Sequence, residues 1–477
     1  MKNWNVRKAI VTREEMPEHH RLAQTLSWPH LVAMGVGAII GVGILVLIGS
    51  GAARAGPAMI LSFAIAGLIC ACAALAYAEM ATMYPASGSA YTYSYVVYGE
   101  LIAWIVGWSL ILEYSLVVST VAVGWSGYAA GFLDRNGLGL PLALVAGPEL
   151  GGIINVPAIA IIVLVAGLLI YGMRESATVN ALLVLLKLVA LLLFVFVALP
   201  LFNGANFEPF MPNGFGKHWG VGPDGKPLEV GVMAAAAVMF FAFYGFDAIA
   251  TTAEETKNPD RDLAIGIVGS MLICVIVYMA VAAAAIGAVA YTRFAPSQEP
   301  IAFILAEINQ VWVAKFIGLA AVVAIPTVIL AFLYGQSRIF FVMARDGLLP
   351  ASLARVSKRG TPVRITLFTA TVVSVIAGLF PIDEIAALAN AGTLLAFIAV
   401  CAAMLTMRRR EPNAPRKFTT PWPWVVGLFG IVGCIYLFLS LPQKTQIYFL
   451  IWNVIGLVIY VIYGGPRAER ARALQNG

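Results

Sequence analysis

Charged residues are scarce in this chain: Asp, Glu, Lys and Arg make up only 11% of its 477 residues. Soluble globular domains carry about 25% charged residues, so this composition excludes a soluble protein. Hydrophobic residues instead reach 61% of the chain, and the mean hydropathy is +0.89. Apolar runs of about 20 residues, the length that crosses a bilayer, recur along the whole sequence. The chain is therefore predicted to be a multi-pass membrane protein.

Cysteine and histidine are also rare, with five and four residues respectively. All five cysteines fall inside predicted membrane spans, and their odd number and scattered spacing indicate reduced thiols rather than disulfides. Cys70 and Cys72 stand two apart on a helix and face different directions, so we expect no metal site there. The sequence shows no convergent nucleophile, base and oxyanion donors. We therefore expect neither an enzyme nor a cofactor.

Twelve apolar spans can be counted between the polar stretches. The first 28 residues lack the apolar core of a signal peptide, so the amino terminus is expected to stay inside the cell. On that assignment 22 Lys and Arg residues fall on inward segments and 7 on outward ones, which favours two cytoplasmic termini. The net charge of +6 then reflects topology in the cell membrane, and no nucleic-acid partner is expected. The spans are about 29–53, 58–83, 98–130, 154–172, 178–201, 229–253, 263–292, 311–344, 363–380, 383–407, 422–442 and 445–464.

A Gly- and Pro-rich outward loop, residues 202–228, divides the chain after its fifth span. Because five is odd, a second group of five spans must enter the membrane with inverted topology, which suggests an inverted repeat. The predicted divisions are a tail at 1–28, a first repeat at 29–201, the loop at 202–228, a second repeat at 229–407, a basic loop at 408–421, spans eleven and twelve at 422–464, and a tail at 465–477.

The first span contains GVGAIIGVGILVLIG, which begins at Gly35 and whose five glycines weaken a plain helix. One interpretation is a GxxxG packing face at Gly37 and Gly41. A channel filter also exposes backbone, but it normally uses several symmetry-related copies. A dinucleotide fingerprint is excluded because it needs a strand and a soluble helix. The remaining interpretation is an unwound segment, Gly41-Val42-Gly43, in the middle of the membrane.

The sixth span carries a second interruption, in MFFAFYGFDAIATTAEE, with Gly245 amid aromatic residues. At a break, the free amides that begin one half-helix suit a carboxylate, and the carbonyls that end the other suit an ammonium. Two such breaks at mid-membrane depth therefore predict a site for an α-amino acid zwitterion.

Three segments together resemble a known family. GVGAIIGVGILVLIG, FFAFYGFDA followed by AEETKNPDRDLAIGI, and GQSRIFFVMARDGLLP at 335–350 resemble helices one, six and eight of the amino acid, polyamine and organocation (APC) transporter superfamily. The likeness spans about residues 28–410 and is closest to bacterial members of the cationic amino acid transporter family. It implies an all-α, LeuT-like membrane fold of two inverted five-helix repeats, with helices one and six broken and helices eleven and twelve added. It also implies alternating access to a site at the bilayer midplane.

The resemblance further implies roles for individual residues. Backbone amides near Val42 and Gly43 would hold the substrate carboxylate, and Gly41 also belongs to the binding site. Many relatives have Thr where Val42 stands, so one hydroxyl contact is missing here. Phe241 would close over the substrate as a gate. The substrate amine would be held by four carbonyls, those of Ile39, Phe241, Ala242 and Tyr244.

Lys187, in ALLVLLKLVALLLF, is a lone charge within the fifth predicted span. A charge at the centre of a helix costs about 2.5 to 3.5 kcal/mol on insertion scales, so Lys187 is expected to face protein or water and to have a function. Snorkelling to the interface is the alternative, against which its long apolar flanks argue. In relatives a lysine at this place substitutes for a sodium ion against helix one. The resemblance therefore implies that Lys187 couples transport to protons.

Four further positions are weaker candidates. Glu113, in WSLILEYSLVV, is expected to pair with a cationic substrate or a helix-one backbone group, to remain protonated as a hydrogen-bond donor, or to form a structural hydrogen bond between helices. Asp247 is expected one or two turns beyond the second break, where it would stabilise a loop or an inner gate. Thr327 and Val328 follow a proline in the eighth span and are candidates for the selectivity wall.

The leading hypothesis is a proton-coupled, sodium-independent amino acid permease with H⁺ as its coupling ion. An amine or polyamine permease, or an amino acid exchanger, is the alternative on the same fold. No covalently linked accessory subunit is expected because no cysteine falls in a predicted outer loop. The sequence does not determine which substrate side chain the site accepts, and it does not determine the oligomeric state.

Overall fold

The chain is mostly helical. A computed structural model describes residues 6–8, 24–86, 88–171, 177–223, 225–350, 353 and 363–476. Most of the predicted tail at 1–28 lies outside the described residues. Within the described part of the chain, ten helical segments are long and apolar enough to cross a membrane. Two shorter apolar helices, α8 (Val156–Tyr171) and α17 (Val363–Leu379), accompany them.

The remaining helices follow the order of the predicted spans. Before the long loop come α1 (Trp28–Ile39), α2 (Val42–Leu45), α3 (Leu47–Ala55), α4 (Met59–Met83), α5 (Ser89–Tyr98), α6 (Glu100–Arg135), α7 (Leu142–Val145) and α9 (Ala177–Ala198). After it come α10 (Val232–Met239), α11 (Asp247–Ala250), α12 (Pro259–Ala288), α13 (Tyr291–Phe294), α14 (Pro300–Glu307), α15 (Val311–Ala324), α16 (Pro326–Arg345), α18 (Ile382–Arg410), α19 (Pro423–Ser440), α20 (Gln443–Ile459) and α21 (Gly465–Asn476).

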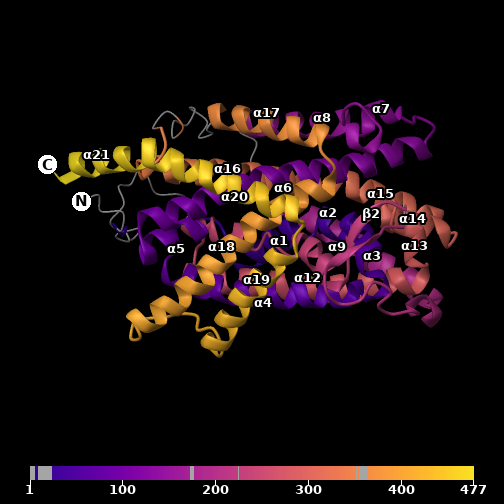
Figure 1. Cartoon of the computed structure of the whole chain (residues 1–477), viewed down its shortest axis with the longest axis horizontal. Helices are drawn as coiled ribbons and strands as arrows, with labels where there is room; N and C mark the ends of the chain where they lie inside the picture. Colours follow the sequence, from indigo (N-terminus) through magenta and orange to yellow (C-terminus); the bar gives the residue numbers. More distant parts are fainter. Residues whose placement is uncertain are drawn as a thin grey trace.

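The long loop contains a β-hairpin that the sequence did not predict, because four-residue strands are too short to show alternation. Strands β1 (His218–Val221) and β2 (Pro227–Val230) pair antiparallel. Arg54, at the end of α3, fixes β2 by donating from Nη1 to the Glu229 carbonyl at 3.0 Å. We call this end of the molecule the hairpin end, and the opposite end, which carries α21, the tail end (Figure 1).

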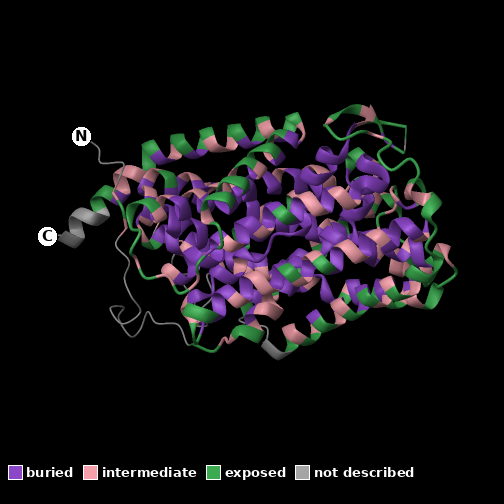
Figure 2. Cartoon of the chain, turned by 90° about the horizontal axis from the view of Figure 1, so that it is seen from below, coloured by how far each residue is buried: buried purple, intermediate pink, exposed green. Residues whose placement is uncertain are grey.

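The buried residues run along the centre of the bundle, and exposed residues lie on the outer helices (Figure 2). Every residue of α10 is buried, and its four consecutive alanines let neighbouring helices approach closely. All five cysteines are buried free thiols, as predicted. Leu185, Phe368 and Leu428 are among the large apolar side chains that remain exposed. Such an apolar exterior is what a lipid environment requires.

Candidate functional site

The first break separates α1 from α2. α1 ends at Ile39, Ile40 is extended with φ −73° and ψ 102°, and α2 begins at Val42. The helix is therefore interrupted at Ile40 and Gly41, just before the centre of the predicted segment. Val42 and Gly43 are the first residues of α2, so their amides have no acceptor one turn earlier in the helix.

The second break follows α10, which passes at Met239 into a 3₁₀ turn, Phe240–Ala242. The chain then runs without regular helix to Asp247, where α11 begins. The Asp247 carboxylate accepts the Gly245 amide at 3.1 Å through Oδ1 and the Tyr114 hydroxyl at 3.1 Å through Oδ2. Asp247 therefore caps the break itself, rather than lying one or two turns beyond it.

The two breaks touch each other at two glycines. A Cβ on Gly43 would lie 2.4 Å from the Ala242 Cα, so no side chain fits there. Gly245 has a φ of +123°, and a Cβ on it would lie 3.0 Å from the Ala38 carbonyl carbon. Glycine adopts this backbone conformation without steric cost, whereas other residues do not. These contacts explain two of the glycines that mark the predicted breaks.

Other glycines of the first motif serve helix packing. A Cβ on Gly35 would lie 2.5 Å from Ser270 Oγ, and one on Gly37 would lie 2.7 Å from a methyl carbon of Val184. Gly41 instead faces Val328, because a Cβ on Gly41 would lie 3.3 Å from Val328 Cγ2. The packing and unwinding interpretations therefore both hold, but at different glycines.

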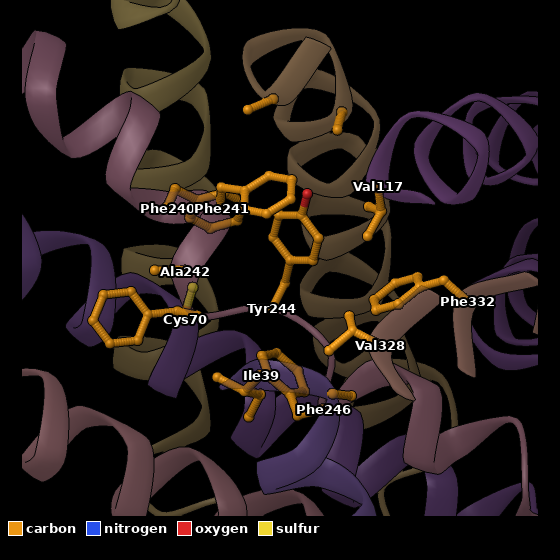
Figure 3. Packing of buried hydrophobic residues seen from close by; sticks show 14 of the residues in the cluster. Ile39, Cys70, Val117, Phe240, Phe241, Ala242, Tyr244, Phe246, Val328 and Phe332 are labelled. Atoms are coloured by element: carbon orange, nitrogen blue, oxygen red, sulfur yellow. The ribbon is translucent and has the colours of Figure 1, made fainter. Parts of the chain in front are cut away.

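A small cavity of about 10 Å³ lies between the breaks, enough for about one water molecule. Figure 3 shows the labelled side chains of Ile39, Val117, Tyr244, Val328 and Phe332 around it. The complete lining is Ala38, Ile39, Gly41, Val42, Gly43, Val117, Val121, Phe241, Tyr244, Val328 and Phe332.

Most of the predicted binding residues line this cavity, with two exceptions. Ala242 contacts Gly43 beside it, and Thr327 points elsewhere although its neighbour Val328 is part of the wall. The sequence did not identify Val117, Val121 and Phe332, which complete the wall from α6 and α16. Both helices are apolar over most of their length, so hydrophobicity gives no signal for the face that meets the site.

The cavity wall is apolar apart from backbone groups and one phenol. The Tyr244 hydroxyl is buried, and no described residue offers it a hydrogen bond. The Phe241 ring packs edge to face on the Tyr244 ring, with centroids 4.9 Å apart. The cavity can therefore take an apolar group, with one hydroxyl and the broken backbone as its polar contacts.

Val42 packs its side chain against α6 at Gly124. A Cβ on Gly124 would lie 2.4 Å from Val42 Cγ1 and 2.7 Å from Cγ2. The absence of a side chain at Gly124 thus makes room for the branched residue at position 42.

Lys187 reaches from α9 to the back of the first break and is only 4% exposed. Its Nζ donates to the Gly37 carbonyl at 2.8 Å and to Thr327 Oγ1 at 3.1 Å. Thr327 in turn donates to the Ala324 carbonyl at 2.8 Å, where α15 gives way to α16. Lys187 therefore ties together α9, the end of α1 and the start of α16.

A second hydroxyl supports the end of α1 from α12. Tyr278 Oη donates to the Ile39 carbonyl at 2.8 Å. The Ile39 carbonyl, predicted to hold the substrate amine, is thus already an acceptor, and its second lone pair remains for another donor.

Glu113 is fully buried on α6, one helical turn from Val117. Among the described residues, neither of its carboxylate oxygens has a hydrogen-bond partner within 3.5 Å. α18 packs closely here, since a Cβ on Gly392 would lie 3.1 Å from Glu113 Cβ. Glu113 is not part of the cavity lining, so the structure brings it near the site but not into it.

Ion pairs and backbone contacts hold the tail end together beneath the site. Lys8 Nζ lies 2.7 Å from Asp346 Oδ1, and Arg338 pairs with Glu255. Residue Leu26, just before α1, forms a backbone bridge with Thr256. These contacts fix the first half-helix against the segment that follows the second break.

The hairpin end is more open. A cavity of about 410 Å³ extends there from Ser50 and Asp383 to Val46 and Gly124. Gly124 lines this cavity and contacts the side chain of Val42, which lines the small cavity. The 410 Å³ cavity therefore ends next to the small one, on its hairpin side. The site is therefore closer to open space on the hairpin side.

Membrane-length helices, two facing helix breaks and a small cavity between them are features of membrane transporters. Residues 26–463 match the model of the amino acid permease family, and the chain belongs to this family. It is a multi-pass membrane transporter and not an enzyme.

Several curated proteins are similar over nearly the whole chain. The branched-chain amino acid permease BcaP of Bacillus subtilis (strain 168) is 45% identical over 444 residues, which cover 92% of each chain. The methylthioribose transporter of the same organism is 38% identical over 461 residues, which cover 96% of this chain and 97% of that protein. The vacuolar cationic amino acid transporter 2 of Arabidopsis thaliana is 38% identical over 420 residues, which cover 86% of this chain and 65% of that protein.

Proposed function

We propose that this chain is a proton-coupled, sodium-independent permease for neutral amino acids with branched aliphatic side chains. The observation that carries the proposal is the cavity in which the backbone of both breaks meets an aliphatic wall. The amides of Val42 and Gly43 would hold the carboxylate. The carbonyls at the ends of α1 and of the 3₁₀ turn would hold the ammonium. The 45% identical relative is named a branched-chain amino acid permease, which agrees with this side-chain class.

The wall favours a neutral side chain over a cationic one. Val117, Val121 and Val328 supply only methyl groups, and Phe332 supplies a ring. A guanidinium or ammonium placed there would lose its hydration and could gain only the Tyr244 hydroxyl as an acceptor side chain from the cavity lining. The apolar wall therefore argues against arginine or a polyamine as the main substrate.

The proposed fold is the twelve-span, LeuT-like arrangement of two inverted five-helix repeats. Its support is that α1–α2 and α10–α11 are both broken, and that each pair opens one of the two predicted repeats. The hairpin end would face outward. The site would then be closed inward by the Lys8–Asp346 and Arg338–Glu255 pairs, and the 410 Å³ cavity next to it would open to the outside.

The 10 Å³ cavity is too small for an amino acid, so substrate entry must enlarge it. Phe241 is the proposed gate because its ring lines the cavity and packs edge to face on Tyr244. Movement of Phe241 would enlarge the small cavity, which the Val42 side chain separates from Gly124 in the lining of the 410 Å³ cavity.

Lys187 is the proposed proton-coupling residue. Proton loss would replace the charge-assisted hydrogen bonds from Lys187 to the Gly37 carbonyl and Thr327 by weaker neutral ones, and so would loosen α1 from α16. A proton moving down a membrane potential supplies about 2.3 kcal/mol per 100 mV, which supports roughly fifty-fold accumulation.

The first test is uptake of labelled leucine into sodium-free proteoliposomes, with and without an inward proton gradient. We expect gradient-driven uptake that unlabelled isoleucine and valine inhibit strongly, alanine weakly, and arginine and putrescine not at all. Methylthioribose lacks both the carboxylate and the α-amine, so we expect it not to compete. Inhibition by arginine or putrescine but not by isoleucine would reject the proposed substrate class.

The coupling role is tested with Lys187→Met, and Lys315→Met on α15 serves as the matched control because its Nζ lies over Trp312, away from the site. We expect Lys187→Met to lose proton-driven accumulation while it still exchanges internal for external leucine. Full gradient-driven accumulation by Lys187→Met would reject the coupling role.

A further inference from the structure

A second, larger cavity lies away from the proposed transport site. It is a groove of about 860 Å³ between α6, α17, α18 and α20, next to the hairpin. Small-molecule sites typically have volumes of about 300 to 1,000 Å³, so this groove is large enough to hold a ligand. Its apolar part is formed by Leu112, Leu116, Ile376, Phe380, Leu388 and Ile447. We call it the lateral groove.

The hairpin end of the lateral groove carries charges of both signs. Lys444 Nζ lies 2.8 Å from Glu384 Oε1, and Arg54 Nη2 lies 3.3 Å from Asp383 Oδ2. The side chains of Lys444, Glu384 and Asp383 are 51%, 36% and 40% exposed, whereas that of Arg54 is 7% exposed. The accessible charge is therefore two carboxylates and one ammonium.

This charge arrangement complements a headgroup that bears both a cation and an anion. A headgroup with only negative charge would face two carboxylates for one ammonium, and like charges brought together oppose binding. A primary ammonium can donate charge-assisted hydrogen bonds to carboxylates, which are stronger than neutral ones. A quaternary ammonium has no N–H group with which to do so.

We propose that the lateral groove binds one glycerophospholipid with an ethanolamine headgroup. An acyl chain lies along Leu112, Leu116 and Leu388, and the ammonium donates to the carboxylates of Glu384 and Asp383. Lys444 donates to the phosphate. The lipid comes from the membrane leaflet on the hairpin side, because the charged residues lie at that end of the lateral groove.

The bound lipid would contact two elements that also border the transport site. Leu116 of α6 lines the lateral groove, whereas the next residue, Val117, lines the cavity between the breaks. Asp383 lines the groove and the 410 Å³ cavity, and accepts a hydrogen bond from Ser50 of α3 at 3.0 Å. Leucine uptake should therefore be faster in ethanolamine-lipid vesicles than in vesicles whose only zwitterionic lipid has a choline headgroup.

Binding is measured by native mass spectrometry of the full-length, delipidated protein. Phosphatidylethanolamine, phosphatidylcholine and phosphatidylglycerol with identical acyl chains are added in turn. We expect one ethanolamine lipid to be retained, with an affinity about tenfold above the other two, the scale of one charge-assisted hydrogen bond. Equal retention of the three lipids, or preference for the choline or glycerol lipid, would overturn the proposal.

Matched variants locate the lipid. Ile447→Trp fills the groove from a half-exposed position of α20, and Leu450→Trp adds the same ring on the same helix outside the groove lining. We expect only Ile447→Trp to weaken ethanolamine-lipid binding, by about tenfold, with both variants unfolding at the wild-type temperature. Equal effects of the two variants would place the lipid elsewhere on the surface and overturn the assignment.

The headgroup contact is tested separately with Glu384→Gln. Glu307→Gln is its control, since Glu307 pairs with Arg293 at 2.8 Å in a similar surface ion pair that is not part of the groove lining. We expect Glu384→Gln to remove the preference for ethanolamine over choline lipid and Glu307→Gln to keep it. A preference that survives Glu384→Gln contradicts the proposed headgroup contact.

Discussion

Replacing Gly43 with alanine tests the contact between the two breaks most directly. The new Cβ would lie 2.4 Å from Ala242 Cα, 2.7 Å from its Cβ and 3.1 Å from its amide nitrogen. Non-bonded carbon atoms approach to about 3.5 Å, so the two breaks must separate by about 1 Å. Overpacking of this kind costs about 1 to 3 kcal/mol, which is roughly a 5- to 150-fold change in an equilibrium constant.

We expect Gly43→Ala to weaken leucine binding by that factor, measured as the concentration for half-maximal uptake in proteoliposomes. Gly167→Ala on α8 is the matched control, because no described atom outside its own helix backbone and chain neighbours lies within 4 Å of the added methyl group. Both variants should elute from size exclusion like the wild type. Wild-type leucine uptake by a well-folded Gly43→Ala protein would refute the reasoning that the breaks must touch to form the site.

Three further predictions concern single side chains. Asp247→Ala removes the acceptor of the Gly245 amide, so it should lower the free energy of unfolding by about 1 to 3 kcal/mol more than Asp247→Asn, measured by thermal unfolding. Val121→Ala widens the cavity, so phenylalanine should become a competitor of leucine uptake. If phenylalanine competes no better than with the wild type, the substrate side chain does not lie against Val121. Burial raises the pKa of Glu299, outside the membrane spans, above its ordinary 4.5, although pairing with Arg135 opposes this. The protonated form is thus favoured on folding, and its stabilisation is lost as the pH rises through the raised value, so wild type should lose stability relative to Glu299→Gln as the pH rises above about 4.5.

The broken helices could be predicted from the sequence because each leaves a local signal. Glycines in a long apolar run and a glycine amid aromatics both mark backbone that cannot remain helical, and the structure has a break at each place. A lone lysine in an apolar span likewise requires partners, and Lys187 has them at the first break. These features are visible locally because membrane burial penalises any unpaired polar group.

The remainder of the site could not be predicted, because it depends on which faces of long helices meet. Val117 and Val121 look like any other apolar residues of α6 until the helix is placed beside the breaks. Thr327 and Val328 are adjacent in sequence, yet one contacts Lys187 and the other lines the cavity. Which of two neighbours faces the site is decided by the rotation of α16, which its sequence alone does not fix.

The fit of Val42 against Gly124 has a consequence for protein engineering. Threonine has nearly the shape of valine, so Val42→Thr should occupy the same space over Gly124 and add one hydroxyl at the edge of the cavity. That hydroxyl would be costly to bury unless a substrate or the backbone paired with it. Directed evolution that starts from Val42→Thr would therefore favour substrates with a polar group that pairs with this second hydroxyl of the cavity.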